Sequence, residues 1–251
     1  KGVALGLASR GYTVYVSGRS QAEGDAALPG SIHQTAREID AAGGRGIAVR
    51  CDHARDADVA ALLAQTWTSR LLVFAYHRIV PKPDSMLQGE VTAAAFDSQT
   101  GWLARHATVL TLPDAIERWR RGKLPRRAAC ITFDDGYLSN FETALPILQR
   151  WQVPATFFIA TGFLDGGRMW NDTIIEATRR TSVAAFDLSD YGLGRVAIDA
   201  ERPVLADQLL DALRRLPYDQ RERCVAAIAT QSRVDLPNDL MMTSEQVRQL
   251  A

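Results

Sequence analysis

Residues 128–137 read AACITFDDGY, an apolar run that ends in two adjacent carboxylates and a glycine. The first six residues are typical of a short buried strand, and Gly136 allows the chain to turn sharply after it. Asp134 and Asp135 are therefore expected at the carboxyl end of a strand, where both side chains can reach one pocket. Like charges this close resist joint ionisation unless a cation or a proton intervenes. The pattern thus indicates one carboxylate on a metal and the other acting as a base.

The stretch TFDDGY at 132–137 resembles the first motif of the polysaccharide deacetylase (NodB-homology) family of carbohydrate esterases. Upstream, LLVFAYHRI at 71–79 is similar to the first strand of that family. Downstream, ALPIL at 144–148 and VPATFFIATG at 153–162 are similar to its next helix and strand. The resemblance covers about residues 70–251. It implies an α/β fold that contains the opening part of a distorted (β/α) barrel.

In that family the first Asp of the motif is the catalytic base and the second binds a divalent metal. The resemblance therefore implies Asp134 as the base and Asp135 as a metal ligand, with zinc as the expected metal. The implied reaction is removal of N-acetyl groups from amino-sugar polysaccharides, an amide hydrolysis that needs an activated water and a polarised carbonyl. The alternative interpretation is an Asp-Asp-Gly turn that closes a strand with both acids in solvent.

The metal-binding histidines of the family come from a His-(Ser/Thr)-x-x-His motif, which usually follows a helix resembling residues 242–251. This chain has four histidines, and none of them has that partner spacing. We therefore expect a domain truncated before the motif, an unclosed barrel of marginal stability, and weak or no activity. The four histidines are His33, His53, His77 and His106.

Three further residues are candidates for the pocket. His77 follows the first expected strand, on the same barrel end as Asp134, and related deacetylases carry Tyr-His at this place; its alternative role is a hydrogen bond to a neighbouring loop. Tyr137 completes the motif. Trp170 could stack on a sugar ring, although a lone Trp is more often a loop anchor packed on the core. The other three histidines are expected at the surface.

Residues 1–66 have a different character, with helices and strands in alternation. This order implies a parallel sheet with crossover helices, and it resembles the opening of the short-chain dehydrogenase/reductase family, a partial Rossmann-like segment. The expected elements are a helix at 3–10, a strand at 12–17, a helix at 31–42, a strand at 46–52 and a helix at 56–66.

The same resemblance places two residues at a cofactor site. Arg19 would follow the second strand of the family, where it could pair with the 2′-phosphate of NADP, and Asp52 would be the adenine-contacting residue. However, the glycine-rich phosphate loop is absent, and no Tyr has a Lys four residues on. NADP binding is therefore not expected, and Arg19 is interpreted as a solvated cation. The alternatives to a deacetylase are an NADP-dependent short-chain oxidoreductase fragment and a non-catalytic fusion fragment.

Composition excludes several classes of protein. The 251 residues include 29 Lys plus Arg and 29 Asp plus Glu, so no net charge attracts nucleic acid. No apolar run approaches the roughly 18–20 residues that span a bilayer, and no signal peptide begins the sequence given. The default location is therefore cytoplasmic, although relatives of the deacetylase segment act mostly on envelope or secreted glycans. The expected partner is an amino-sugar polysaccharide or oligosaccharide, and nothing indicates the oligomeric state.

The three cysteines, Cys51, Cys130 and Cys224, lie far apart and suggest neither a disulfide framework nor a zinc knuckle. Cys51 and Cys130 are interpreted as buried thiols.

The remaining elements of the second segment are expected from apolar periodicity and capping residues. Asp114 is expected to cap a helix, and Thr243 with Gln246 to open a last helix through a capping box. A helical insertion is expected at about 172–235. The other expected elements are a strand at 71–76, a helix at 96–106, an extended stretch at 109–112, a helix at 139–150 interrupted at Pro146, a strand at 156–160, and helices at 204–216 and 219–232.

Overall fold

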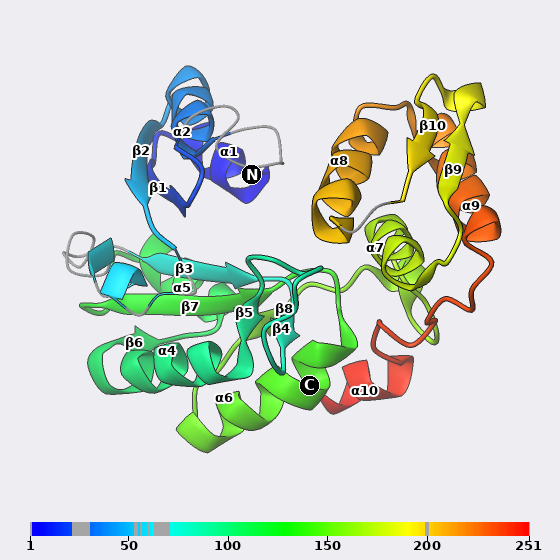
Figure 1. The fold of residues 1–251 in the computed structure, drawn as a ribbon. Helices are drawn as coiled ribbons and strands as arrows, with labels where there is room; N and C mark the ends of the chain where they lie inside the picture. The colour runs from blue at the N-terminus through cyan, green and yellow to red at the C-terminus, as the bar shows by residue number, and fades with distance from the viewer. Residues whose placement is uncertain are drawn as a thin grey trace. The chain divides into compact units, whose positions relative to one another are not determined.

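The chain divides into two compact units, Lys1–Trp67 and Thr68–Ala251. The computed structural model describes residues 2–21, 31–52, 55, 57–59, 61–62, 71–198 and 201–250 (Figure 1). In these ranges no helix is both long enough and apolar enough to cross a membrane.

The first unit is a β-α-β arrangement preceded by a helix. Its elements are α1 (Gly2–Ala8), β1 (Thr13–Gly18), α2 (Ile32–Ala41) and β2 (Arg45–Arg50). The two strands pair in parallel, as the alternation of elements predicted. Close packing of α2 on the sheet requires Gly46, since a Cβ there would lie 2.1 Å from the carbonyl oxygen of Ala36. Residues 57–59 and 61–62 of the helix expected at 56–66 are helical, and the rest of it, with the junction near residue 67, lies outside the described residues.

The second unit is built on a parallel sheet whose central strand is β7 (Ala128–Phe133). Strand β3 (Leu72–Tyr76) pairs along one edge of β7. The other edge is shared by β6 (Thr108–Val109) at the amino end and β8 (Thr156–Phe157) at the carboxyl end. Every residue of β7 is buried. These described strands form an open sheet, and the incomplete (β/α) barrel implied by the resemblance remains a prediction. A short parallel pair, β4 (Ile79–Val80) with β5 (Val91–Thr92), lies beside it.

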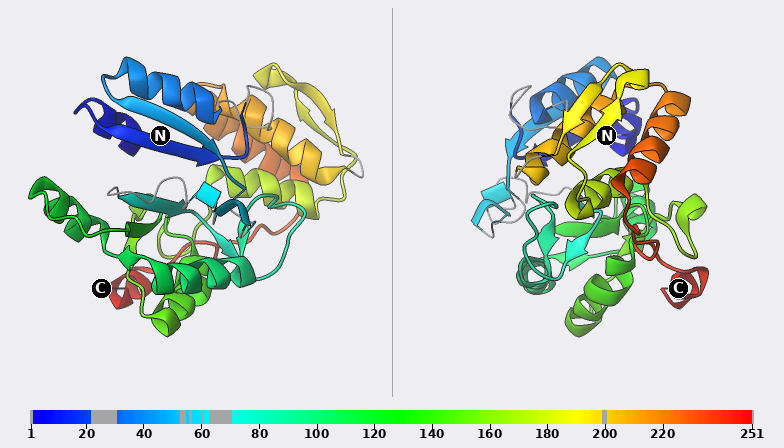
Figure 2. Two further views of the ribbon diagram at one scale, coloured as in Figure 1. Left: turned by 90° about the vertical axis from the view of Figure 1, so that its left-hand side faces the viewer. Right: turned by 45° about the vertical axis from the view of Figure 1, so that its right-hand side comes forward.

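Helices pack against both faces of this sheet. Helices α4 (Ala93–His106) and α6 (Leu145–Trp151) lie side by side along one face (Figures 1 and 2), where Tyr76, Phe96, Phe133 and Phe157 make ring contacts with centroids 5.0–5.6 Å apart. On the other face α5 (Leu112–Arg120) packs Ala115 near the buried Cys130. Burial on both faces explains why the central strand is an unbroken apolar run.

Three local expectations for this unit need correction. The N-cap of α5 is Thr111, whose hydroxyl accepts from the backbone N–H of Asp114, because the helix begins at Leu112 and places Asp114 inside its first turn. The strand expected at 156–160 is only two residues long. The helix expected at 139–150 begins as a π-helix over Asn140–Ala144 and becomes α-helical at α6. Pro146 in the first turn of α6 cannot donate a backbone hydrogen bond, which accounts for the wider turn before it.

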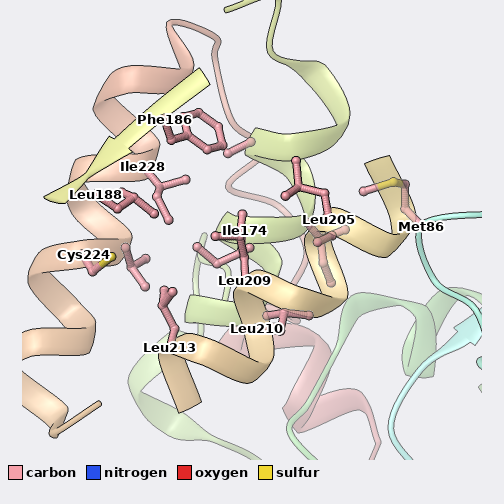
Figure 3. Packing of buried hydrophobic residues seen from close by; sticks show 14 residues of the cluster. Met86, Ile174, Phe186, Leu188, Leu205, Leu209, Leu210, Leu213, Cys224 and Ile228 are labelled. Atoms are coloured by element: carbon pink, nitrogen blue, oxygen red, sulfur yellow. The ribbon is translucent and has the colours of Figure 1, made fainter. Parts of the chain in front are cut away.

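A mostly helical part with its own core follows the sheet. It comprises α7 (Trp170–Arg180), the antiparallel hairpin of β9 (Ala185–Leu188) and β10 (Gly194–Ala197), α8 (Arg202–Arg214) and α9 (Tyr218–Ser232). Figure 3 shows Ile174, Phe186, Leu213 and Ile228 packed together in this core, and all four are fully buried. Helices α8 and α9 were predicted with their own bounds, α7 lies mostly within the helical insertion expected at about 172–235, and the hairpin was not predicted.

The last helix, α10 (Ser244–Gln249), begins with the predicted capping box. The hydroxyl of Thr243 accepts from the backbone N–H of Gln246 at 3.1 Å, and the side chain of Gln246 accepts from that of Thr243 at 2.8 Å. The segment just before it is tied to the Asp-Asp-Gly turn, because Met242 donates its N–H to the carbonyl of Gly136 at 3.0 Å.

Candidate functional site

Asp134 and Asp135 form a tight turn at the carboxyl end of β7. The backbone takes left-handed conformations at Asp135 (φ 73°) and Gly136 (φ 86°), which glycine adopts freely and Asp tolerates better than most residues. The carbonyl of Asp135 accepts from the N–H of Ala160 at 3.0 Å. Together with the bond from Met242, this contact holds the turn from two sides. The two carboxylates are therefore carried on a fixed piece of backbone.

His77 lies next to Asp134, at the end of the neighbouring strand. Its Nε2 is 3.9 Å from Oδ2 of Asp134, and the side chains are 56% and 41% exposed. The pair is close enough to interact electrostatically when the imidazole is protonated, and both groups can meet a ligand from solvent. The structure thus brings together two residues that were predicted to share one end of the sheet.

The carboxyl of Asp135 is partly buried. Burial raises its pKa; the nearby His77 opposes this rise, and the charge of Asp134 adds to it. The surroundings of Asp135 therefore favour its protonated form more than water does, an effect that a cation close to the carboxyl would offset.

A buried network lies directly behind this edge. Arg78 Nη2 is 2.6 Å from Oδ1 of Asp172, with side-chain exposures of 12% and 1%. Tyr137 donates its hydroxyl to the same oxygen at 3.4 Å and accepts from the Asn171 amide at 3.3 Å. The Arg78 guanidinium also stands over the Tyr137 ring, 4.1 Å from its centroid. Tyr137, a pocket candidate, is therefore a buried residue whose hydroxyl is engaged, and burial raises its pKa.

Sequence reasoning missed this network and the neighbouring Glu90. Arg78 and Asp172 are 94 positions apart, and no local pattern links them. Burial raises the pKa of Glu90, against the lowering effect of the Arg78 and His77 charges. The sequence did offer one signal, because Arg78 directly follows Tyr76 and His77 at the end of a strand. A charged side chain that is buried there needs a partner of opposite charge.

Trp170, the other pocket candidate, begins α7 and packs against the core of the helical part. The guanidinium of Arg221 stands over its ring, 4.9 Å from the centroid. Packing against the core agrees with the alternative interpretation of Trp170 as an anchor residue, and the guanidinium of Arg221 covers its ring.

The metal implied by the family resemblance does not fit the side chains present. In the part of the chain that the structure describes, no three His, Cys, Asp or Glu residues are grouped so that they could hold an ion. Asp135 supplies one carboxylate, whereas zinc in proteins generally takes at least three protein ligands.

The cofactor candidates of the first unit follow the ends of two paired strands. Arg19 is exposed after β1, and Asp52 follows β2. The side chain of Asp58 contacts the residues at the end of β2. It accepts a hydrogen bond from the backbone N–H of Asp52 at 3.0 Å and lies 3.5 Å from the guanidinium of Arg50.

His33, His106 and the three cysteines do not belong to the edge described above. His33 and His106 are exposed, as predicted, and His53 lies outside the described residues. All three cysteines are buried free thiols. Burial raises the pKa of Cys51 and Cys224 to about 11 and that of Cys130 to about 12.

One segment of the second unit, which contains β7 with Asp134 and Asp135, matches a known family. Residues 121–182 match the family model described as Polysaccharide deacetylase. The poly-beta-1,6-N-acetyl-D-glucosamine N-deacetylase of Staphylococcus epidermidis is 30% identical over 133 residues, which are 48% of this chain and 46% of that protein. The protein of the same name from Staphylococcus aureus is 42% identical over 73 residues, which are 29% of this chain and 25% of that protein. The chain thus spans less than half of either relative.

Among solved structures, a de-N-acetylase from Aggregatibacter actinomycetemcomitans is 20% identical with a TM-score of 0.39, covering 72% of this chain and 50% of that one. A TM-score this low does not by itself establish a shared fold. The polysaccharide deacetylase family is supported by the family model and the curated relatives.

The resemblance of residues 1–66 to the short-chain dehydrogenases is not supported. The matched family segment, 121–182, lies wholly in the second unit. A single β-α-β unit is shared by many α/β proteins of unrelated function, which is why its pattern was a weak guide.

Proposed function

We propose that this chain carries part of a carbohydrate N-deacetylase that removes acetyl groups from an N-acetylglucosamine polysaccharide. The observation that supports this most directly is the position of Asp134 and Asp135, inside the segment that matches the family and beside His77. The relatives named as poly-beta-1,6-N-acetyl-D-glucosamine N-deacetylases point to that polymer as the substrate class.

In the proposed reaction Asp134 acts as the general base. It takes a proton from a water molecule whose oxygen attacks the carbonyl carbon of the acetamide. Protonated His77 gives a proton from Nε2 to the nitrogen as the carbon–nitrogen bond breaks, leaving acetic acid, which ionises to acetate in water, and a free amine. The cycle closes when the proton on Asp134 is passed to His77. General acids and bases of this kind contribute about 10²- to 10⁴-fold each to the rate.

Asp135 is the residue that a divalent metal, zinc by the family resemblance, would use at this edge. Such an ion would polarise the acetamide carbonyl and lower the pKa of water. Because the described side chains do not complete a site for it, no step above is assigned to a metal. We therefore expect slow turnover by the chain as given.

The test is release of acetate from a β-1,6-linked N-acetylglucosamine pentasaccharide by the wild type and by Asp134→Asn. The substitution is expected to lower the rate about 10²- to 10⁴-fold, or to background, because the base is lost. The matched control is Asp114→Asn, which removes a carboxylate of similar exposure, 44% against 41%, from helix α5. This control is expected to leave the rate unchanged.

Equal rates for the wild type and Asp134→Asn would contradict the assigned base. The same assay with added zinc or cobalt tests the expectation of slow turnover, since fast, metal-dependent acetate release would show that the chain binds an ion productively.

A further inference from the structure

Three strand ends are in register at the edge of the sheet. Asp134 donates its backbone N–H to the carbonyl of Tyr76 at 2.8 Å, and in a parallel pair this bond makes the following residue, His77, the direct neighbour of Asp134. On the other side, Phe158 donates its N–H to the carbonyl of Phe133 at 2.7 Å. By the same rule Phe158 is the other direct neighbour of Asp134.

The row is therefore His77, Asp134 and Phe158, one residue from each of three adjacent strands. Direct neighbours in a sheet project to the same face, with their strands about 5 Å apart. The 3.9 Å contact between His77 and Asp134 agrees with this placement. The row presents an imidazole, a carboxylate and a phenyl ring side by side.

The exposure of Phe158 is the unusual feature of this row. Its side chain is 45% exposed, whereas the preceding Phe157 stacks on Phe133 in the aromatic core with centroids 5.0 Å apart. Alternation along the strand turns Phe158 to the opposite face from that core. A large apolar side chain in water loses the stabilisation that burial would provide, and Phe158 differs from the other exposed apolar residues of this face in adjoining Asp134.

We propose that Phe158 is the apolar wall of the substrate subsite and packs against the C–H face of the N-acetylhexosamine whose acetamide meets Asp134 and His77. This inference rests on the function proposed above. A pyranose ring has an apolar face of C–H groups and a rim of hydroxyl and amide groups, so it needs an apolar surface next to hydrogen-bonding groups. The row supplies the apolar surface and the hydrogen-bonding groups within the width of three strands. Contact between the sugar ring and Phe158 would also displace water from around the acetamide.

Val73 provides a matched control on the same sheet face. It is 43% exposed. In the register of β3 and β7, Val73 pairs with Cys130 and Ala75 with Thr132, so the next pair on the same face is His77 with Asp134. Its position four residues before His77 places it about 13 Å from the row, at roughly 3.3 Å per residue. The two residues thus have equal exposure and one face in common, and they differ in whether they adjoin Asp134.

The experiment measures binding of a β-1,6-linked N-acetylglucosamine pentasaccharide to the full chain by isothermal titration calorimetry. Phe158→Ala is expected to weaken binding about tenfold or more, since truncating an aromatic anchor commonly costs that much. Phe158→Tyr keeps the ring and is expected to bind within about twofold of the wild type, as is Val73→Ala. Circular dichroism melting of each variant shows that it is folded, which is expected because both positions are exposed.

Each outcome decides the proposal. If the wild type binds and Phe158→Ala binds equally well, or if Val73→Ala weakens binding as much, the assigned wall is wrong and the deacetylase function is untouched. If the wild type fails to bind, the assigned wall is overturned, and acetate release decides the function separately. If binding depends on Phe158 while no acetate is released, the subsite stands and the proposed function fails.

Discussion

His77 and Arg78 are consecutive residues, yet each pairs with an aspartate in an opposite environment. His77 meets Asp134 at 3.9 Å with about half of each side chain in solvent. Arg78 meets Asp172 at 2.6 Å with both side chains almost wholly buried. One pair is open to ligands, and the other joins the sheet to helix α7.

The difference shows that the end of one strand can serve two purposes. Neighbouring side chains at a strand end project to opposite sides, so one can face water while the next faces the interior. The exposed pair can exchange its partners for water or a ligand at little cost. The buried pair cannot, because an unpaired charge in its place would be strongly unfavourable. The buried pair therefore holds the backbone from which His77 projects.

The largest effect on stability is expected when the buried pair is broken. Asp172→Ala should lower the free energy of unfolding by about 3–5 kcal/mol, because it leaves the Arg78 charge buried without its partner. It also removes the acceptor of the Met169 N–H at 2.9 Å. Urea unfolding followed by circular dichroism measures the change.

The exposed pair supplies the comparison for that measurement. Asp134→Ala should change the free energy of unfolding by no more than about 0.5 kcal/mol, as is usual for exposed positions. Replacing both members of the buried pair, with Arg78→Met and Asp172→Leu, should recover part of the loss. If Asp134→Ala were as destabilising as Asp172→Ala, the contrast between the two pairs would be wrong.

A smaller effect is expected at Tyr137, which connects the turn to the buried pair. Tyr137→Phe removes a buried hydroxyl that contacts Asp172 and Asn171, and should cost about 1 kcal/mol in the same urea experiment. Tyr218→Phe is the control, because Tyr218 is 68% exposed. Equal stability of Tyr137→Phe and the wild type would show that the hydroxyl contributes no net stabilisation.

The smallest effect is a change in pH dependence at Glu90. Burial raises the pKa of the Glu90 carboxyl above the ordinary 4.5. The folded chain therefore binds a proton on this carboxyl more tightly than the unfolded chain does. The contribution of Glu90 to stability is thus fully present below pH 4.5 and is lost as the pH rises through the folded pKa. Glu90→Gln should remove this loss, so that its stability relative to the wild type increases from pH 4 to pH 7. A constant difference across that range would contradict the buried carboxyl.

Elements with strong local patterns were predicted correctly. The unbroken apolar run of β7 and the capping box at Thr243 each depend on residues within a few positions of one another, so no distant contact can reverse them. Helices α8 and α9 follow the same rule through their apolar periodicity. Two wrong predictions are also local: the N-cap of α5, which is Thr111, and the regular helix before Pro146. They arose because more than one nearby residue can fill the same cap or turn position.

The rest of the candidate site depends on contacts between distant segments. The sequence pointed to His77, Asp134 and Asp135 as residues of one edge, but not to the pairing of Asp172 with Arg78, 94 positions away. Phe158 looked like part of a buried apolar strand. Only the pairing of its N–H with Phe133 shows that it stands next to Asp134 on the face away from the core.

The sequence by itself determined that a buried strand ends in two carboxylates and that a histidine follows the first strand of the same unit, because strand formation and glycine turns depend on neighbouring residues. Tertiary structure alone decided which side chains surround those carboxylates. Strand register and helix packing set which residues far apart in the chain become neighbours, and they thereby separate the open pair of Asp134 with His77 from the closed pair of Asp172 with Arg78.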